Sequence, residues 1–377
     1  MDRVNVLYLH ETSKISGAEN SLINLVKNLD RKRFSPCFIL PEDGPLVSEI
    51  KSLKIPVILI PFPKIRYGLG VLKTIGQLRG FIKEKNISLV HSNSIRTHIY
   101  GSIAAKYTGI FSIWHQRNLI TNEIIDLDRL FSFLPDRIIC NSAAIARRFQ
   151  SRGHIPEKVR IVLNGVDTVS FNPSIDGAKI REEFAIQPNE IVVGIASRFN
   201  LQKGHETFLN AAAIILSCQT NLQNKIRFLI AGGAVFRSDK KREQYLQDVA
   251  KKLGISDRVI FTGFRKDMPQ VYAAMDIFVL ASDAEPCGRV IFEAMASGKP
   301  LIATDSGGTP EIVQDGVSGY LFTFGDSQGL AEKILYFCNN PDLAKKMGQA
   351  GRKRVEDNFS IEKNVRQIED IYIELCQ

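Results

Sequence analysis

The sequence reads Ala281-Ser-Asp-Ala-Glu-Pro-Cys-Gly-Arg-Val-Ile-Phe-Glu-Ala-Met-Ala-Ser-Gly-Lys-Pro300 at the point that decides its fold. An apolar run of strand length, 276–282, leads into this stretch, and after Gly288 the apolar residues recur at helical spacing. Gly298 and Pro300 are typical of the residues that follow a helix C-terminus. The stretch therefore predicts a strand, a loop and a helix. The first N–H groups of such a helix are unpaired and form a ready site for an anion.

Two carboxylates lie in this stretch, Glu285 in the loop and Glu293 in the helix. A glycosidase needs its two carboxyl groups about 5 to 9.5 Å apart, whereas eight helical residues would separate this pair by roughly 12 Å. A hydrolytic pair is therefore a poor interpretation, and two separate contacts with the hydroxyls of one elongated ligand fit better. On composition alone, the plainer alternative is that Glu285 is a loop charge and Glu293 faces solvent.

The pattern Glu285-x7-Glu293, followed by Ala-Met-Ala-x-Gly-x-Pro, resembles the signature of the retaining glycosyltransferases of family 4, which have the GT-B fold. The resemblance implies that Glu285 contacts the transferred sugar and that Glu293 binds the ribose hydroxyls of the donor. It also implies contacts with the donor sugar or phosphate from the residues between them, Cys287, Gly288, Arg289 and Val290. Family members often have Phe where this chain has Cys287, so the shape of the sugar pocket stays open.

Length and composition point to an ordinary globular chain of two domains. With 377 residues, 44% of them hydrophobic, each domain can bury its own core. The six cysteines show no metal-binding spacing, which is typical of reduced thiols in a cytoplasmic protein. There is no signal-peptide pattern and no apolar run near the roughly 20 residues that span a bilayer. We therefore expect a cytoplasmic protein, either soluble or peripheral on the inner face of the membrane.

The positive charge lies in the first half of the chain. Residues 1–180 hold 25 Lys and Arg against 15 Asp and Glu, a net +10, whereas residues 181–377 hold 24 against 25, a net −1. An anionic membrane surface or a lipid-linked acceptor would explain the basic half, and so would a plain solvated surface. No concentrated basic tract with interleaved aromatics is present, so no nucleic acid partner is expected. The candidate basic residues are Arg31, Lys32, Arg33, Lys64, Arg66, Lys83 and Lys85.

Apolar runs of strand length alternate with helical patterns along the chain, which predicts parallel sheets with helical crossovers. The expected strands are 4–10, 34–40, 57–62, 87–93, 110–116, 137–141 and 159–163, then 191–197, 226–231, 259–262, 276–282, 301–304 and 320–322. Turn-forming residues at 171–177 suggest a linker. The prediction is an α/β protein of two Rossmann-like, doubly wound domains, 1–172 and 173–360, facing across a cleft. Ligands are expected at the carboxyl ends of the strands, and the resemblance implies that the last helix, 361–377, packs back on the first domain.

Two cations follow the first strand of the second domain, Arg198 and then Lys203 before Gly204. Cations in this position suit a diphosphate, because a leaving nucleotide gains negative charge as the glycosidic bond breaks. A plain surface pair is the alternative. The match to the family pattern Arg-x4-Lys-Gly implies that both bind the donor diphosphate. The resemblance also places the loop with Phe264 and Arg265 against the nucleotide base.

In the first domain, Ser16 and Gly17 follow the first strand and open a helix. They resemble the glycine-rich loop beside the acceptor in family 4, although a lone glycine also suits a simple turn. His91, Asn93 and His115 lie at the ends of later expected strands, 87–93 and 110–116. A histidine at a strand end is more often a structural hydrogen-bonder than a catalyst. The resemblance implies that His115 acts catalytically near the transferred sugar and that His91 and Asn93 lie near the acceptor.

Asp126 and Asp128 have the Asp-x-Asp form that holds a metal in the other major glycosyltransferase fold, but an apolar pattern after them predicts helix N-terminal acids. We therefore expect no metal and no cofactor. The expected activity transfers a sugar, with retention, from a nucleotide-sugar co-substrate to a glycan, a lipid-linked molecule or a small molecule. The alternatives are a nucleotide-sugar epimerase of the same fold and a non-catalytic sugar- or nucleic-acid-binding protein. A dehydrogenase is disfavoured because no strand precedes an intact Gly-x-Gly-x-x-Gly.

Overall fold

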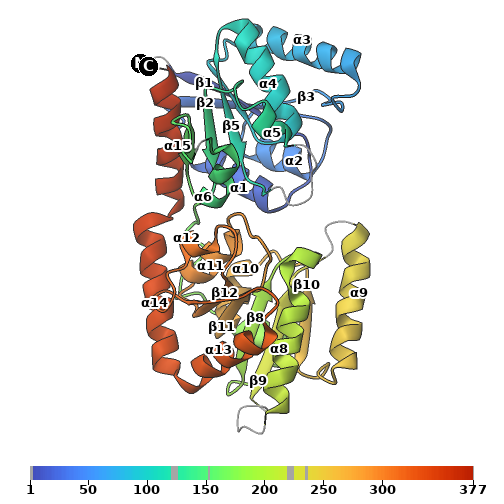
Figure 1. Cartoon of the computed structure of the whole chain (residues 1–377), viewed down its shortest axis with the longest axis vertical. Coiled ribbons are helices and arrows are strands. Elements are labelled where there is room, and N and C mark those ends of the chain that lie inside the picture. The colour runs from blue at the N-terminus through green and yellow to red at the C-terminus, as the bar shows by residue number, and fades with distance from the viewer. Residues whose placement is uncertain (1–2, 120–125, 152, 219–224, 234–236, 377) are drawn as a thin grey trace. The chain divides into compact units, whose positions relative to one another are not determined.

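The computed structural model describes residues 3–119, 126–151, 153–218, 225–233 and 237–376. The chain forms two compact units, Met1–Gly165 with Ile361–Gln377, and Val166–Ser360. Figure 1 labels their elements. The expected boundary at residue 172 lies inside the second unit, because the backbone of Val166 bridges to Ser360 and donates to the carbonyl of Phe359. The last helix, α15 (Ile361–Cys376), is part of the first unit.

The first unit is built on seven parallel strands in the order β3-β2-β1-β4-β5-β6-β7. Every strand expected in this domain is present. β3 ends at Leu59, ahead of Pro61 and Pro63, whose nitrogens cannot donate to a strand ladder. The bounds are β1 (Val4–Leu9), β2 (Phe34–Leu40), β3 (Val57–Leu59), β4 (Leu89–Ser92), β5 (Phe111–Gln116), β6 (Arg137–Cys140) and β7 (Val159–Ile161).

The second unit has six parallel strands in the order β10-β9-β8-β11-β12-β13. The bounds are β8 (Ile191–Ala196), β9 (Ile226–Ala231), β10 (Val259–Gly263), β11 (Ile277–Leu280), β12 (Leu301–Thr304) and β13 (Tyr320–Phe322). The predicted fold class, α/β with two Rossmann-like domains, is confirmed. Both sheets reverse their winding direction once, between β1 and β4 and between β8 and β11. Ligands bind outside the carboxyl ends of the strands at such switch points.

Helices cover both faces of each sheet (Figure 1). Those of the first unit are α1 (Gly17–Asn28), α2 (Pro45–Ser52), α3 (Gly68–Glu84), α4 (Ile95–Thr108), α5 (Leu127–Leu130), α6 (Ala143–Ala146) and α15. Those of the second are α7 (Ala178–Glu183), α8 (His205–Ser217), α9 (Arg237–Lys252), α10 (Met268–Ala274), α11 (Arg289–Ala296), α12 (Thr309–Ile312), α13 (Ser327–Asn339) and α14 (Pro341–Asn358).

The core of the first unit follows the alternation of side chains along its strands. Val6 and Tyr8 of β1 pack in one cluster with α1, α2 and α15, whereas Leu7 and Leu9 pack in another with α3 and α4. The two clusters lie on opposite faces of the sheet. Because α15 supplies buried side chains such as Ile368 to the first cluster, it is an integral layer of this unit.

We expect Ile368→Ala to lower the free energy of unfolding of the first unit by about 2–5 kcal/mol, because it leaves a cavity under α15. The matched control is Gln367→Ala, an exposed neighbour, which should cost less than about 0.5 kcal/mol. Trp114, the one tryptophan of the chain, is buried in this unit and reports its unfolding in urea by fluorescence. Equal urea midpoints for both variants would show that α15 is not part of the core.

Candidate functional site

Two side chains from neighbouring strand ends meet at the switch point of the second unit. The Nζ of Lys203 lies 2.5 Å from Oε2 of Glu285. Lys203 ends the short 3-10 turn Leu201–Lys203 that follows β8, and Glu285 lies in the loop after β11. The two side chains are only 22% and 11% exposed. The structure thus joins two residues that the sequence assigns to different parts of one donor.

The loops that carry Lys203 and Glu285 are joined by a backbone hydrogen bond and pack closely against each other. The N–H of Asp283 donates to the carbonyl of Gln202 over 2.7 Å. Gly204 has a φ of +63°, and a Cβ there would stand 1.9 Å from the carbonyl oxygen of Ala281. Gly307 is equally constrained, because its Cβ would stand 2.1 Å from the carbonyl oxygen of Glu285. Glycine at 204 therefore permits the approach that brings Lys203 to Glu285.

Glu293 is buried in α11 and only 3% exposed, so the alternative that it faces solvent is wrong. The Tyr272 hydroxyl donates to its Oε2 over 2.9 Å, and Arg289, one turn earlier in the helix, pairs with its Oε1 at 2.8 Å. Burial and the adjacent carboxylate raise the pKa of Tyr272 well above its usual range, which keeps the phenol protonated and donating. The sequence does not predict Tyr272 as a partner of Glu293, because Tyr272 lies on another helix, α10.

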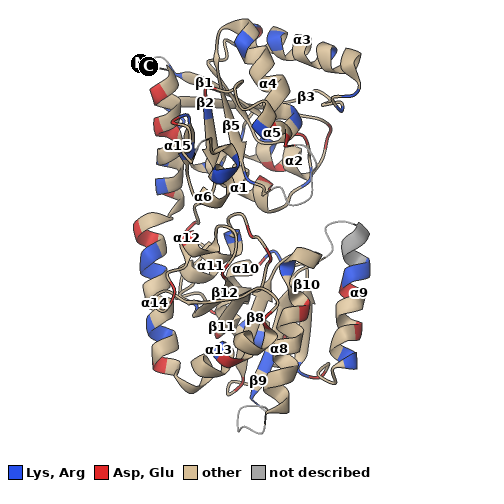
Figure 2. Ribbon diagram, in the orientation of Figure 1, with Lys and Arg blue, Asp and Glu red and all other residues tan. Residues whose placement is uncertain are grey.

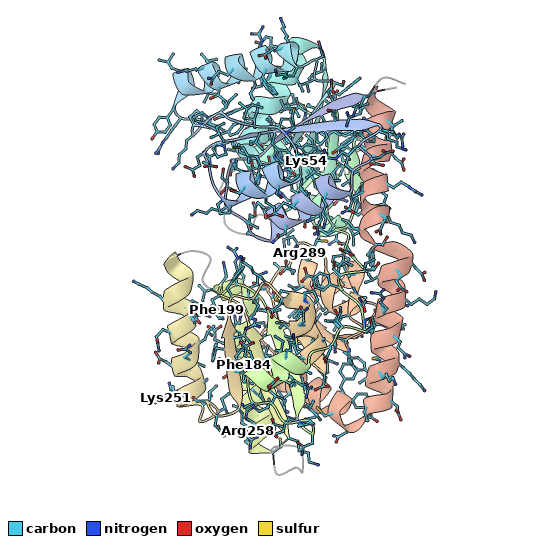
Figure 3. All side chains as sticks on the ribbon, turned by 180° about the vertical axis from the view of Figure 1, so that it is seen from behind. Lys54, Phe184, Phe199, Lys251, Arg258 and Arg289 are labelled. Atoms are coloured by element: carbon cyan, nitrogen blue, oxygen red, sulfur yellow. The ribbon has the colours of Figure 1, made fainter. Side chains whose placement is uncertain are left out.

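The start of α11 is where the sequence predicts it. The helix begins at Arg289, with Gly288 as its N-cap, and Cys287 and Gly288 are buried. Val290 is half-buried in the first turn. In any helix the first N–H groups have no intrahelical partner. Arg289 lies at the edge of the second unit in Figure 3.

The loop after β10 presents one of its two expected residues to solvent. Phe264 is 68% exposed and offers a flat apolar face. Arg265 is not available in the same way, because its guanidinium bonds Glu183 at 2.6 and 3.0 Å and Asp267 at 2.6 and 2.8 Å. We therefore reassign Arg265 from a base contact to holding this loop. Arg198, at the end of β8, is exposed.

In the first unit, Ser16 caps α1 through a buried carboxylate that sequence reasoning missed. Glu19 accepts from the Ser16 N–H at 2.8 Å and from Ser16 Oγ at 2.5 Å, and its other oxygen lies 2.7 Å from His10 Nε2. Burial alone would raise the pKa of Glu19, but the bonds from His10 and Ser16 lower it to about 2. The spacing Ser-x-x-Glu is the readable signal, since it is that of a capping box. Gly17 is exposed, and a Cβ there would meet nothing within 4 Å.

His91 and His115 are buried in a chain of hydrogen bonds. His91 is 0% exposed and His115 is 2% exposed. Nδ1 of His91 lies 2.6 Å from the Tyr372 hydroxyl on α15, and its Nε2 lies 3.2 Å from Nδ1 of His115. The same Nδ1 lies 3.2 Å from a guanidinium nitrogen of Arg117. Burial and then the charge of Arg117 lower the pKa of both histidines well below the usual range, so both are neutral.

The direction of these bonds fixes the tautomers. A guanidinium can only donate, so Nδ1 of His115 accepts, and a neutral imidazole with an accepting Nδ1 carries its proton on Nε2. Nε2 of His91 then donates to His115, and Nδ1 of His91 accepts from Tyr372. The geometry leaves His91 no ring nitrogen for an acceptor molecule. We therefore reassign His91 from acceptor contact to the support of His115.

Asn93 is the other residue expected near an acceptor, and it lies at the carboxyl end of β4. Its amide nitrogen is 3.4 Å from the carbonyl oxygens of Leu9 and His91. Its Oδ1 is buried without a hydrogen-bond partner among the residues that the structure describes. A buried oxygen without a hydrogen bond costs folding free energy, so a ligand that donates a hydrogen bond to Oδ1 of Asn93 would be favoured.

The Asp-x-Asp motif acts as predicted for helix N-terminal acids. Asp126 accepts from the N–H of Arg129 at the start of α5, and Asp128 is buried 2.8 Å from Nδ1 of His98. Within the described ranges no group of three His, Cys, Asp or Glu is placed to hold a metal. None of the described helices combines the length and the apolarity required to cross a membrane.

A hollow at the amino ends of β8 and β11 is a weaker candidate for a ligand site than the edge with Lys203 and Glu285. It is lined by residues around Asp176, Asn189 and Asp276, where β8 and β11 begin. Its cation, Arg181, already pairs with Asp276 at 2.6 Å. Ligands of parallel sheets bind at the carboxyl ends of the strands, which favours the Lys203 and Glu285 edge.

Two family models match the chain, one over each unit. The model described as Glycosyltransferase Family 4 matches residues 15–170, and the model described as Glycosyl transferases group 1 matches residues 176–354. EpsD of Bacillus subtilis is 33% identical over 229 residues, which are 60% of this chain and 57% of EpsD. The UDP-Gal:alpha-D-GlcNAc-diphosphoundecaprenol alpha-1,3-galactosyltransferase of Escherichia coli is 24% identical over 99% of this chain and 97% of its own length.

Solved structures show the same architecture. HepE of Anabaena in complex with UDP and glucose is 27% identical, with a TM-score of 0.85 over 99% of this chain and 100% of HepE. A glycosyltransferase of Rickettsia africae has a TM-score of 0.90 over 100% of both chains, and at 22% identity it supports the fold alone. The fold is therefore GT-B, and the chain belongs to the group 1 glycosyltransferases, that is, to glycosyltransferase family 4.

Proposed function

We propose that this chain transfers a sugar from a UDP-sugar to an acceptor with retention of the anomeric configuration. The observation that carries the proposal is the pairing of Lys203 with Glu285 at the switch point of the second unit. At this partly buried edge of the sheet, the cation can bind the diphosphate of a nucleotide sugar and the carboxylate can bind the hydroxyls of its sugar. HepE, 27% identical over nearly the whole chain, was solved with UDP and glucose, which supports uridine as the base.

Two ion pairs in the second unit suggest how the donor is recognised. Lys203 pairs with Glu285 and Arg289 pairs with Glu293, so each carboxylate is neutralised by a neighbouring cation. Phosphate oxygens form strong charge-assisted bonds with such cations. We propose that the diphosphate takes Lys203 and Arg289 together with Arg198, and so frees Glu285 for the sugar and Glu293 for the ribose.

The remaining contacts follow from the same arrangement. Gly288 and Val290 would offer the first N–H groups of α11 to the phosphate, and Cys287 would border the sugar. Phe264, being exposed, would stack on the base. The cations and the helix N-terminus would stabilise the charge of the leaving nucleotide, so we propose that the reaction needs no metal and no other cofactor.

The first unit would bind the acceptor and assist at the sugar. We assign His115 the role of a hydrogen-bond donor through Nε2–H, since its Nδ1 is occupied and its ring is neutral. The exposed Gly17, the half-buried Ser16 and the Oδ1 of Asn93, which has no partner among the described residues, would contact the acceptor. We propose a lipid-linked acceptor, which the basic first half of the chain and the printed name of the Escherichia coli relative support.

The diphosphate assignment is tested by Arg198→Ala and Lys203→Ala. Each should weaken UDP binding by about 1.5–3 kcal/mol, the worth of a bond to a charged group, and leave uridine binding unchanged. The control is Lys345→Ala, which removes a charge from the exposed face of α14. Isothermal titration measures both ligands, and unaltered UDP affinity in both variants would contradict the assignment.

Substitutions of Glu285 and Glu293 should change different kinetic constants. Glu285→Ala should lower kcat by about 10²–10³-fold, as for loss of a group that stabilises the transition state. Glu293→Gln should raise the KM for the donor with a smaller change in kcat, because the ribose contact is made before the reaction. Initial rates with a UDP-sugar give both constants. The same pattern in both variants would refute this division, and isomerised donor without acceptor would point to an epimerase.

The role of His115 is tested through Tyr372, which lies two hydrogen bonds away. Tyr372→Phe removes the donor to His91 and should lower kcat by about 2- to 10-fold, the worth of one neutral hydrogen bond. The control is Tyr100→Phe, which removes the hydroxyl that donates to the Pro63 carbonyl away from the histidines. Imidazole ¹⁵N spectra should show His115 as the Nε2–H tautomer in the unaltered chain. An Nδ1–H tautomer, or equal kcat losses in both variants, would overturn this role.

A further inference from the structure

The start of α3 exposes apolar side chains that the described residues of the chain leave uncovered. Leu69 is 86% exposed and Leu72 is 67% exposed, and Ile65 and Tyr67, in the loop before the helix, are 41% and 54% exposed. All four lie within residues 64–73, which we call the α3 edge. Single exposed apolar residues are common on protein surfaces, but a cluster of large ones marks a contact site.

The inner and outer faces of α3 differ, so this exposure is not a loss of packing. Ile75, Leu78 and Ile82 point into the core shared with α4. Leu69 and Leu72 are three residues apart and share the outer side of the helix. Further along that side, a Cβ added at Gly76 or Gly80 would meet nothing within 4 Å. The outer face of α3 is thus uncovered within the described chain.

The surroundings of these side chains are basic. Lys64, Arg66 and Lys73 lie within the α3 edge and are exposed, and the described ion pairs include none of them. Arg66 lies 5.1 Å from the ring centre of Tyr67. Residues 50–83 contain no Asp or Glu and seven basic residues, which are Lys51, Lys54, Lys64, Arg66, Lys73, Arg79 and Lys83. Figure 2 shows Lys and Arg along α3.

We propose that the α3 edge docks on a bilayer that contains anionic lipids. Leu69, Leu72 and Ile65 would enter the boundary between headgroups and acyl chains, while Tyr67 would lie at the headgroup level. Lys64, Arg66 and Lys73 would bind lipid phosphates at its rim. The charge selects this occupant, because two copies of the chain would bring like charges together. The inference concerns binding alone and does not depend on the proposed transfer reaction.

The experiment is cosedimentation of the full chain with vesicles of equal parts phosphatidylglycerol and phosphatidylcholine, and with phosphatidylcholine alone. The chain should bind the anionic vesicles at low salt and be released at high salt. Since each basic residue near such a surface contributes about fivefold, Lys64→Gln/Arg66→Gln/Lys73→Gln should lower the partition coefficient roughly 100-fold. Leu69→Ser/Leu72→Ser should lower it by about tenfold or more, since each leucine loses its burial.

Matched controls carry the same changes elsewhere. Lys251→Gln/Lys345→Gln/Lys346→Gln removes the same charge from exposed helix faces of the second unit, and Leu130→Ser/Val169→Ser removes two other exposed apolar side chains. Both controls should bind like the unaltered chain. Binding that ignores lipid charge, or equal losses in variants and controls, would overturn the proposal. So would a dimer in sedimentation velocity that Leu69→Ser/Leu72→Ser dissolves, because the edge would then join two copies.

Discussion

The contact between Lys203 and Glu285 is the interaction around which the proposed donor site is built. It forms because the loops after β8 and β11 are fastened by a backbone hydrogen bond, and because glycine at 204 lets them approach. Both side chains are mostly buried, so losing either one would leave the other as a poorly solvated, unpaired charge. In the proposed mechanism, the donor diphosphate binds Lys203 and so releases the carboxylate of Glu285. In this structure, the charges of Lys203 and Glu285 thus neutralise each other.

The same construction recurs in the first unit. Its switch point, between β1 and β4, brings together the cap of α1 and the residues after β4. There the polar groups bond to one another within the protein. Hydrogen bonds from His10 and Ser16 keep Glu19 ionised, and burial keeps His91 neutral. What each cluster can do differs accordingly. The second unit offers the ion pair of Lys203 with Glu285, and the first offers neutral buried histidines and the exposed Gly17.

The sequence predicts the strands well because each is an apolar run bounded by turn residues, and a parallel sheet buries such runs on both faces. It also predicts the start of α11 from Gly288. It does not predict the partners of the site residues, since Glu293 meets Tyr272 from another helix and His91 meets Tyr372 from the far end of the chain. The division of the chain after Gly165 likewise leaves no local signal, because Val166 pairs with Ser360 from far along the chain.

The decisive measurement is a crystal structure of the full chain with UDP bound. In that structure we expect Nζ of Lys203 to leave Glu285 and to come within hydrogen-bond distance, about 2.7–3.2 Å, of a phosphate oxygen. Oε2 of Glu285 would then face the position that the sugar occupies. If Lys203 stayed bound to Glu285 while other residues held the diphosphate, the proposed role of Lys203 would be wrong.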